Sequence, residues 1–172
     1  LERLGRGAVP SLPLAHNLLL TRTDALGPLG WIRSGALQAQ ARALIERFGV
    51  KAGGPLAPAQ SLSGGNLQKF IVGREIDAQP RLLIVSQPTW GVDVGAAAHI
   101  HAALLALRDA GCAVLVLSEE LEELFALSDR LHVLAKGRLS PSVPRAQASI
   151  ERIGAWMSGL WQLDEEVAHA AA

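Results

Sequence analysis

The sequence predicts an α/β protein with a mostly parallel sheet and a small helical subdomain. Two apolar runs, at residues 82–85 and Ala113–Leu117, have the length and composition of buried strands, and a helix-length segment at 95–110 separates them. Strand, helix and strand in this order form a β-α-β unit with parallel strands. The first third of the chain instead carries apolar residues at helical spacing, between loops rich in glycine and proline.

Two helices are expected in that first third. Pro13 is suited to opening a short helix, because its fixed backbone angle matches the first helical turn. Ser34 is expected to cap a longer helix of about 15 residues. In that helix five apolar residues recur at helical spacing: Leu37, Ala41, Leu44, Ile45 and Phe48. Residues 51–60, rich in glycine, proline and alanine, then form a connecting loop.

A further helix leads into the first predicted strand. It starts near Gly65, runs through Ile76 and is expected to end before Pro80. The proline ring has no N–H to donate and disfavours helical geometry at the preceding residue, Gln79.

The last third of the chain is expected to continue the alternation. Ser118 is predicted to cap a short acidic helix. Residues 130–135 form a third strand, which a tight turn at Lys136 and Gly137 joins to a short partner at Arg138–Leu139. A final helix spans 148–159, and the tail from Asp164 is expected to fray.

The bulk composition limits the function classes. The chain has 172 residues, 49% of them hydrophobic, and sixteen basic residues balance sixteen acidic ones, so it shows no polybasic footprint for nucleic acid. Its one cysteine, Cys112, excludes an internal disulfide and a multi-cysteine metal site, and fits a reducing compartment. No apolar run approaches the roughly 20 residues of a membrane-spanning helix. The opening residues do not resemble a signal peptide, and they suggest a segment of something longer.

The string S61-L62-S63-G64-G65-N66-L67-Q68-K69 is the first segment that could carry chemistry. Its two glycines allow backbone N–H groups to approach an anion, and the helix that follows adds positive potential at its N-terminus. The alternative is that Ser63 or Asn66 only caps this helix. The longer pattern favours a phosphate contact, because a buried strand and then Pro88, Thr89 and Asp93 follow at a suitable distance.

Taken together, these segments resemble the nucleotide-binding domain of ATP-binding cassette (ABC) transporters, which has a P-loop NTPase fold. Residues 62–66 are similar to the signature loop of that family and residues 82–87 to its Walker B strand. Residues 90–93 are similar to the D-loop, and residues 114–119 to the switch-histidine strand. The four motifs also stand in the family's order.

Finer features resemble one branch of the family. They are the ending N66-L67-Q68-K69, the run Q87-P88-T89-W90-G91-V92-D93-V94-G95-A96 and the opening L4-G5-R6-G7. All three are similar to the second, C-terminal cassette of duplicated ATPases that serve simple-sugar and nucleoside importers. The resemblance implies a division into a helical subdomain with the signature loop (1–65), the remainder of the α/β core (66–160) and a flexible tail (161–172).

The sequence departs from the family at the parts that would hold and hydrolyse a nucleotide. It contains no G-x-x-x-x-G-K-[ST] string, so the P-loop portion of the fold is lacking. Ser86 stands where the family has the Asp that supports Mg²⁺, and a hydroxyl lacks that charge. Gln87 replaces the carboxylate that activates water, and an amide has no basicity near neutral pH. Glu119 replaces the switch histidine, where a carboxylate would repel a phosphate.

Each of these residues also has a purely structural interpretation. Ser86 and Gln87 are suitable polar residues for the end of a strand, and Glu119 favours the first turn of a helix. His99 and His101 do not suggest a metal site, because residues two apart on a helix point to nearly opposite faces. We therefore expect no metal ligands within this chain.

The resemblance implies an energy-coupling ATPase that works only in an assembly. Ser63, Gly64, Gly65 and Asn66 would contact ATP held by a first cassette, and Asp93 would lie at the interface between the cassettes. ATP and Mg²⁺ would be held mainly by residues outside this chain. Transmembrane permease subunits and, indirectly, a solute-binding protein would complete the assembly, with no nucleic acid, at the cytoplasmic face of the membrane.

Two other interpretations stay open at this point. An ABC-like pseudo-enzyme that acts as a regulatory or protein-interaction module would also explain the lost carboxylates. A soluble ABC-type ATPase of DNA repair or translation is less favoured, because the chain has neither a basic patch nor zinc-binding cysteines.

Overall fold

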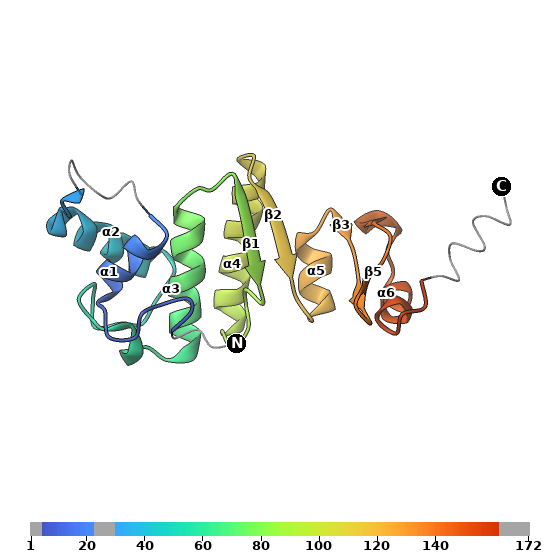
Figure 1. Cartoon of the computed structure of the whole chain (residues 1–172), viewed down its shortest axis with the longest axis horizontal. Coiled ribbons are helices and arrows are strands. Elements are labelled where there is room, and N and C mark those ends of the chain that lie inside the picture. Colours follow the sequence, from blue (N-terminus) through green and yellow to red (C-terminus); the bar gives the residue numbers. More distant parts are fainter. Residues whose placement is uncertain (1–4, 23–29, 162–172) are drawn as a thin grey trace, which may run out of the picture. The chain divides into compact units, whose positions relative to one another are not determined.

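The computed structural model describes residues 5–22 and 30–161. The chain divides into two compact units, Leu1–Leu117 and Ser118–Ala172 (Figure 1). The functional division at residues 65/66 and 160/161 stays a prediction, and of the predicted tail (161–172) the structure describes only Trp161.

Short helices open the first unit. Pro13 precedes helix α1 (Leu14–Asn17), which passes into the 3-10 helix η1 (Leu18–Leu20). Helix α2 (Ser34–Arg47) follows, and buries Leu37, Ala41 and Leu44 as its spacing predicts. The prediction that Ser34 caps α2 is wrong. Arg33 occupies the cap position and Ser34 is already the first helical residue, so this helix starts without a side-chain cap.

Helix α3 (Gly64–Asp77) is the central helix of the first unit. It follows the 3-10 helix η3 (Ala59–Ser61) and buries Leu67, Phe70 and Ile76. It ends as the sequence predicts: Ala78 caps it, and Gln79 leaves helical geometry with a positive φ of 47° just before Pro80.

Gly73 of α3 packs closely against Phe48, the residue that ends α2. A Cβ atom built at Gly73 would lie 2.6 Å from Cδ2 and 2.7 Å from Cγ of Phe48. Phe48 is buried, and its ring also meets His99 edge to face at 5.4 Å between centroids. The aromatic ring therefore fills the space that a side chain at residue 73 would need.

We expect Gly73→Ala to destabilise the first unit by about 1–2 kcal/mol, because overpacking against Phe48 outweighs the helix propensity gained from alanine. Chemical denaturation would measure the loss. The matched control is Gly154→Ala, also inside a helix, where a Cβ would meet nothing within 4 Å. A Gly73→Ala protein as stable as the wild type would contradict this packing.

The β-α-β unit is confirmed. Strands β1 (Leu82–Ser86) and β2 (Ala113–Leu117) are parallel, and their register runs from Leu82 opposite Ala113 to Ser86 opposite Leu117. Helix α4 (Val94–Asp109) connects them, and α3 and α4 cover the same sheet, α3 against β1 and α4 against β2 (Figure 1).

The expectation that both strands are buried is wrong: Leu83 is the one buried residue of β1, and β2 has none. Leu83 is buried, and Ile100, Leu104 and Leu107 of α4 are buried as well. The alternate residues share the opposite face, because side chains alternate along a strand. On that face four aliphatic side chains are 46–62% exposed: Leu82, Ile84, Leu115 and Leu117. Within the described residues, this apolar face of β1 and β2 is uncovered.

The second unit is built from short helices and short antiparallel strand pairs. Its helices are α5 (Leu121–Leu127), the 3-10 helix η4 (Arg145–Gln147) and α6 (Ile150–Met157). Its strands are β3 (Arg130–Leu131), β4 (Leu134–Ala135), β5 (Arg138–Leu139) and β6 (Val143–Pro144).

One strand prediction in this unit needs correction. The hairpin at the Lys136–Gly137 turn is confirmed as the β4–β5 pair, with Lys136 and Gly137 both at positive φ. Residues 130–135 do not form one strand, however. They divide into β3 and β4, and β3 pairs with β6 instead of extending the parallel sheet.

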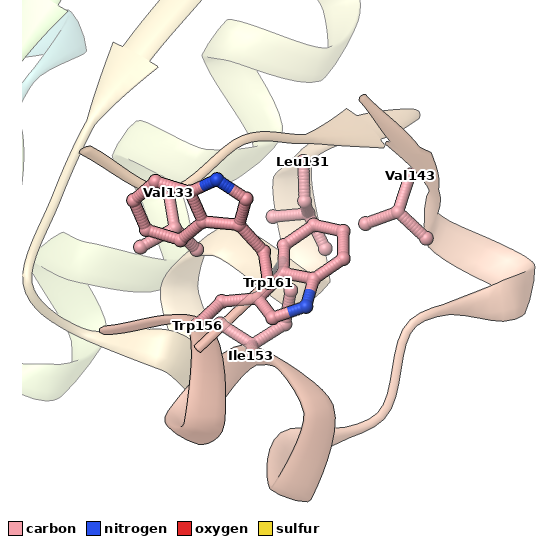
Figure 2. Packing of buried hydrophobic residues seen from close by; sticks show 6 residues of the cluster. All are labelled: Leu131, Val133, Val143, Ile153, Trp156 and Trp161. Atoms are coloured by element: carbon pink, nitrogen blue, oxygen red, sulfur yellow. The ribbon is translucent and has the colours of Figure 1, made fainter. Parts of the chain in front are cut away.

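The core of the second unit gathers around two tryptophans. Trp156 and Trp161 are buried with Ile153 and with three strand or strand-flanking residues, namely Leu131, Val133 and Val143 (Figure 2). The guanidinium of Arg152 lies over the Trp156 ring, 4.8 Å from its centroid. Both indoles thus pack inside the unit, where they bury a large apolar area.

Candidate functional site

The N-terminus of α3 is formed by the glycine-rich segment that the sequence singles out. Ser63 caps the helix: its hydroxyl oxygen accepts from the Asn66 main-chain N–H at 3.5 Å and from the Asn66 side-chain Nδ2 at 2.9 Å. The Asn66 Oδ1 in turn accepts the Lys51 N–H at 2.9 Å. These side chains therefore act as a cap, as the alternative interpretation holds, and they fix the first turn of α3.

This capped end is also open enough to meet a ligand. Ser63 and Gly64 are exposed, and Gly65 and Asn66 are half-buried. The first turn of any helix presents N–H groups along its axis, and the helix dipole adds positive potential there. Capping and anion contact are compatible, because the cap occupies only part of the first turn.

Gly65 has a second reason to be glycine. A Cβ at this position would lie 2.6 Å from the Gly91 carbonyl oxygen, and 3.7 Å from the Val92 Cα. The N-terminus of α3 thus rests directly on the backbone of the turn that follows β1. The sequence pattern does not reveal this contact, because the phosphate argument alone already accounts for the glycine.

The turn after β1, residues 87–93, is held by side chains of α3. Gln68 is buried, and its Nε2 donates to the carbonyl oxygens of both Gln87 and Pro88 at 2.9 Å. Lys69 Nζ lies 3.4 Å from Asp93 Oδ2 and also donates to the Gly49 carbonyl at 3.4 Å. The sequence analysis named Gln68 and Lys69 only as part of a motif and predicted no contact for either residue.

Asp93 begins helix α4 at the far end of the same turn. Its Oδ1 accepts the Ala96 N–H at 2.9 Å, so Asp93 caps α4. That hydrogen bond, together with Lys69, holds the pKa of the Asp93 carboxyl below its ordinary value. The side chain remains 70% exposed and is therefore accessible from solvent.

Ser86 and Gln87 lie at the carboxyl end of β1. Ser86 is exposed and Gln87 half-buried, and the Gln87 N–H donates to the Leu117 carbonyl at 2.7 Å. Gln87 has a positive φ of 52°, an unusual conformation for a residue other than glycine. Neither side chain offers the carboxylate that Mg²⁺ or a water-activating step requires.

Glu119 belongs to the second unit, in the segment between β2 and α5, where it is exposed. The prediction that Ser118 caps the helix is wrong: Glu120 holds the cap position of α5, and the Ser118 hydroxyl accepts the Glu120 N–H at 3.1 Å. Glu119 therefore precedes the helix instead of occupying its first turn.

A cavity of about 540 Å³ lies beside the carboxyl half of β1. Its wall includes Ser86, Gln87 and Gln68, with Arg6 and Trp90 among the other lining residues, and it is mostly apolar. Sequence reasoning did not predict it. In residues 5–22 and 30–161, no cluster of three His, Cys, Asp or Glu side chains is arranged to hold a metal ion. The helices described there are also too short or too polar to cross a membrane.

Comparison with known proteins gives close relatives by sequence, although no family model matches the chain. The chain is 42% identical over 163 residues to the guanosine import ATP-binding protein NupO of Bacillus subtilis (strain 168), covering 94% of this chain and 32% of that protein. It is 41% identical over 160 residues to the nucleoside import ATP-binding protein NupA of Lactococcus lactis subsp. cremoris (strain MG1363), covering 92% and 32%. It is 38% identical over 159 residues to the ribose import ATP-binding protein RbsA 2 of Rhizobium meliloti (strain 1021), covering 92% and 31%.

The chain therefore spans about a third of the length of these curated relatives. Among solved structures, the ATP-binding cassette MJ0796, a dimer bound to ADP and Pi, matches 80% of this chain and 59% of its own with a TM-score of 0.65 at 17% identity. An ATP-binding subunit of an ABC transporter matches 95% of this chain and 64% of its own, with a TM-score of 0.63 at 20% identity. At these identities the structures establish the fold. The chain thus has the fold of part of an ABC ATPase cassette and is homologous to the ATP-binding proteins of nucleoside and sugar importers.

Proposed function

We propose that this chain is part of the ATP-binding, energy-coupling subunit of an ABC importer for nucleosides or simple sugars. The observation that carries the proposal is the N-terminus of α3, where Ser63–Asn66 form an open, capped helix end braced on the turn at 87–93. The relatives support it, because nearly the whole chain aligns with import ATP-binding proteins at about 40% identity.

In this proposal the chain contributes to two different nucleotide sites. Ser63, Gly64, Gly65 and Asn66 contact the phosphates of ATP held by the first cassette, and Asp93 lies at the interface between the two cassettes. The positive end of α3 and its exposed first residues fit an anion. The resulting ATP-dependent closure drives the permease subunits between their two states.

The chain's own strand end supplies the other, degenerate site. Ser86 and Gln87 lack the charge that Mg²⁺ favours, so this donor set does not fit the metal. Glu119, which the family resemblance aligns with the switch histidine, carries a negative charge that would repel a phosphate. We therefore propose that hydrolysis depends on residues of the partner cassette and that the isolated chain is inactive. The assembly lies on the cytoplasmic face of the membrane, together with permease subunits and, indirectly, a solute-binding protein.

Gln87→Ala, made in the assembled transporter that contains this chain, tests whether hydrolysis depends on the partner cassette and not on this chain's own site. We expect ATP turnover to stay within about twofold of the wild type, because an amide that cannot accept a proton contributes little to general base catalysis. A loss on the order of 100-fold, the size expected for a true catalytic base, would mean that the chain's own site is catalytic. An assembly that binds its partners but never hydrolyses ATP would instead favour a regulatory module.

A further inference from the structure

The main chain at Gln87 is held in an unfavourable conformation from two directions. A positive φ for a residue other than glycine or asparagine costs free energy and persists only where the surroundings impose it. On one side, the Gln87 N–H is bonded to the Leu117 carbonyl of β2. On the other, the side chain of Gln68 donates to the carbonyls of Gln87 and Pro88. Gln68 thus contributes the part of this restraint that comes from α3.

Gln68 belongs to a row of contacts that joins the beginning of α3 to the same turn. Gly65 touches Gly91, Gln68 bonds the carbonyls of Gln87 and Pro88, and Lys69 pairs with Asp93. These three residues lie within the first two turns of the helix, immediately after its capped end. The turn at 87–93 therefore has contacts to α3 at both of its ends and in its middle.

Burial makes the two hydrogen bonds of Gln68 structurally decisive. Gln68 and Lys69 are both buried, whereas the turn that they hold carries the exposed residues Trp90 and Asp93. A buried amide whose two N–H groups each meet a carbonyl restrains both acceptors, and replacing it would leave these carbonyls without that donor. An apolar side chain of equal length would fill the space without providing the restraint.

From this geometry we infer that Gln68, assisted by Lys69, is a positioning residue that fixes the turn at 87–93 to α3 and so couples the helix end at Ser63–Asn66 to the strand end at Gln87. The coupling rests on the proposed function, because it requires a nucleotide phosphate at the helix end. The positioning itself does not. The helix end at Ser63–Asn66 and the strand end at Gln87, which belong to different nucleotide sites in the proposal, would then respond together. The reason is that α3 includes the helix end and is hydrogen-bonded to the strand end.

The first arm of the test uses the chain alone and hydrogen exchange of individual amides. The Trp90 N–H donates to the Gln87 carbonyl and the Val92 N–H to the Thr89 carbonyl, so both report the turn. In Gln68→Met, which keeps the length but loses both donors, these amides should exchange about tenfold faster. The amide of Phe48 in the cap of α2 should be unchanged. The control Gln60→Met makes the same chemical change at an exposed residue and should leave the turn as it was.

Unchanged exchange at Trp90 and Val92 in Gln68→Met would overturn the positioning role. If this variant accelerated exchange throughout the first unit, Lys69→Met would decide, because it removes only the contacts of Lys69 with Asp93 and Gly49. Local acceleration at the turn in Lys69→Met would then support the inference. No local change would overturn it.

The second arm uses the assembled transporter with a non-hydrolysable ATP analogue. In the wild type, the nucleotide should protect the amides of residues 63–66 and also those of Trp90 and Val92. In Gln68→Met the first protection should remain and the second should be lost. If residues 63–66 were not protected even in the wild type, the proposed function would fail, and the coupling with it. If they were protected while Trp90 and Val92 did not respond, only the coupling would be overturned.

Discussion

ATP turnover of the assembled transporter should fall by at least about 100-fold when Ser63 is replaced by Arg, because the change fills the end of α3 that we propose to contact a phosphate with a long side chain and removes preorganised contacts. Ser63 is exposed and caps the helix, so the arginine projects from the first turn and its cap is lost as well. Turnover measured at saturating ATP, with solute uptake in parallel, would give the size of the loss.

Two further variants separate loss of the cap from loss of phosphate contact. Ser149→Arg removes an equivalent cap, because Ser149 accepts the Arg152 N–H at the start of α6, and it should leave turnover nearly intact. Ser63→Asp keeps a good helix cap but adds negative charge, so it should be as inactive as Ser63→Arg while remaining fully folded. Normal turnover in both Ser63 variants would show that the N-terminus of α3 is not part of the nucleotide site.

Gly65→Ala should combine a loss of stability with a loss of turnover. The new Cβ would lie 2.6 Å from the Gly91 carbonyl, and a backbone atom cannot move aside as the end of a flexible side chain can. We expect a destabilisation of about 1–3 kcal/mol and a displaced turn at 87–93. Thermal denaturation of the chain and ATP turnover of the transporter measure the two effects.

The matched control for Gly65→Ala is Gly35→Ala. Gly35 is the second residue of α2, as Gly65 is of α3, but a Cβ there would meet nothing within 4 Å. Gly35→Ala should leave the stability unchanged or slightly raised, because alanine favours a helix. A Gly65→Ala protein that matched it in stability and turnover would show that the contact between α3 and Gly91 is unimportant.

The elements that local sequence determines were predicted well. The strand Ala113–Leu117 is found with its predicted bounds, because a continuous apolar run after a glycine leaves few alternatives. The hairpin at Lys136 and Gly137 and the end of α3 before Pro80 were equally visible, since glycine and proline restrict the backbone wherever they occur.

Elements that depend on distant partners were missed. The two-residue strands β3 and β6 have no periodicity to detect, and they exist only because Arg130 and Leu131 meet Val143 and Pro144. The predictions that Ser34 and Ser118 cap helices were wrong for a related reason. A serine near a helix start is a frequent cap, but the residue at which the helix begins depends on packing.

For the candidate site, the sequence indicated which residues could contact a ligand, but not the contacts that hold these residues in place. It pointed to Ser63–Asn66 as a helix end and to Asp93 beyond the next strand, and the structure places both around the same turn. It could not reveal the contact between Gly65 and Gly91 or the double hydrogen bond of Gln68. Both depend on how α3 packs against β1 and the turn after it, and the sequence alone does not tell whether a glutamine is buried.

The uncovered apolar face of β1 and β2 makes the association of the chain depend on temperature. This face has four aliphatic residues that are about half exposed to water, so any association through it is favoured by the entropy of the released water molecules; they are Leu82, Ile84, Leu115 and Leu117. Such association strengthens with warming from the cold and with sulfate or phosphate salts, and it weakens on chilling. Solutions of the chain should therefore keep best when cold and dilute, in buffers without these salts.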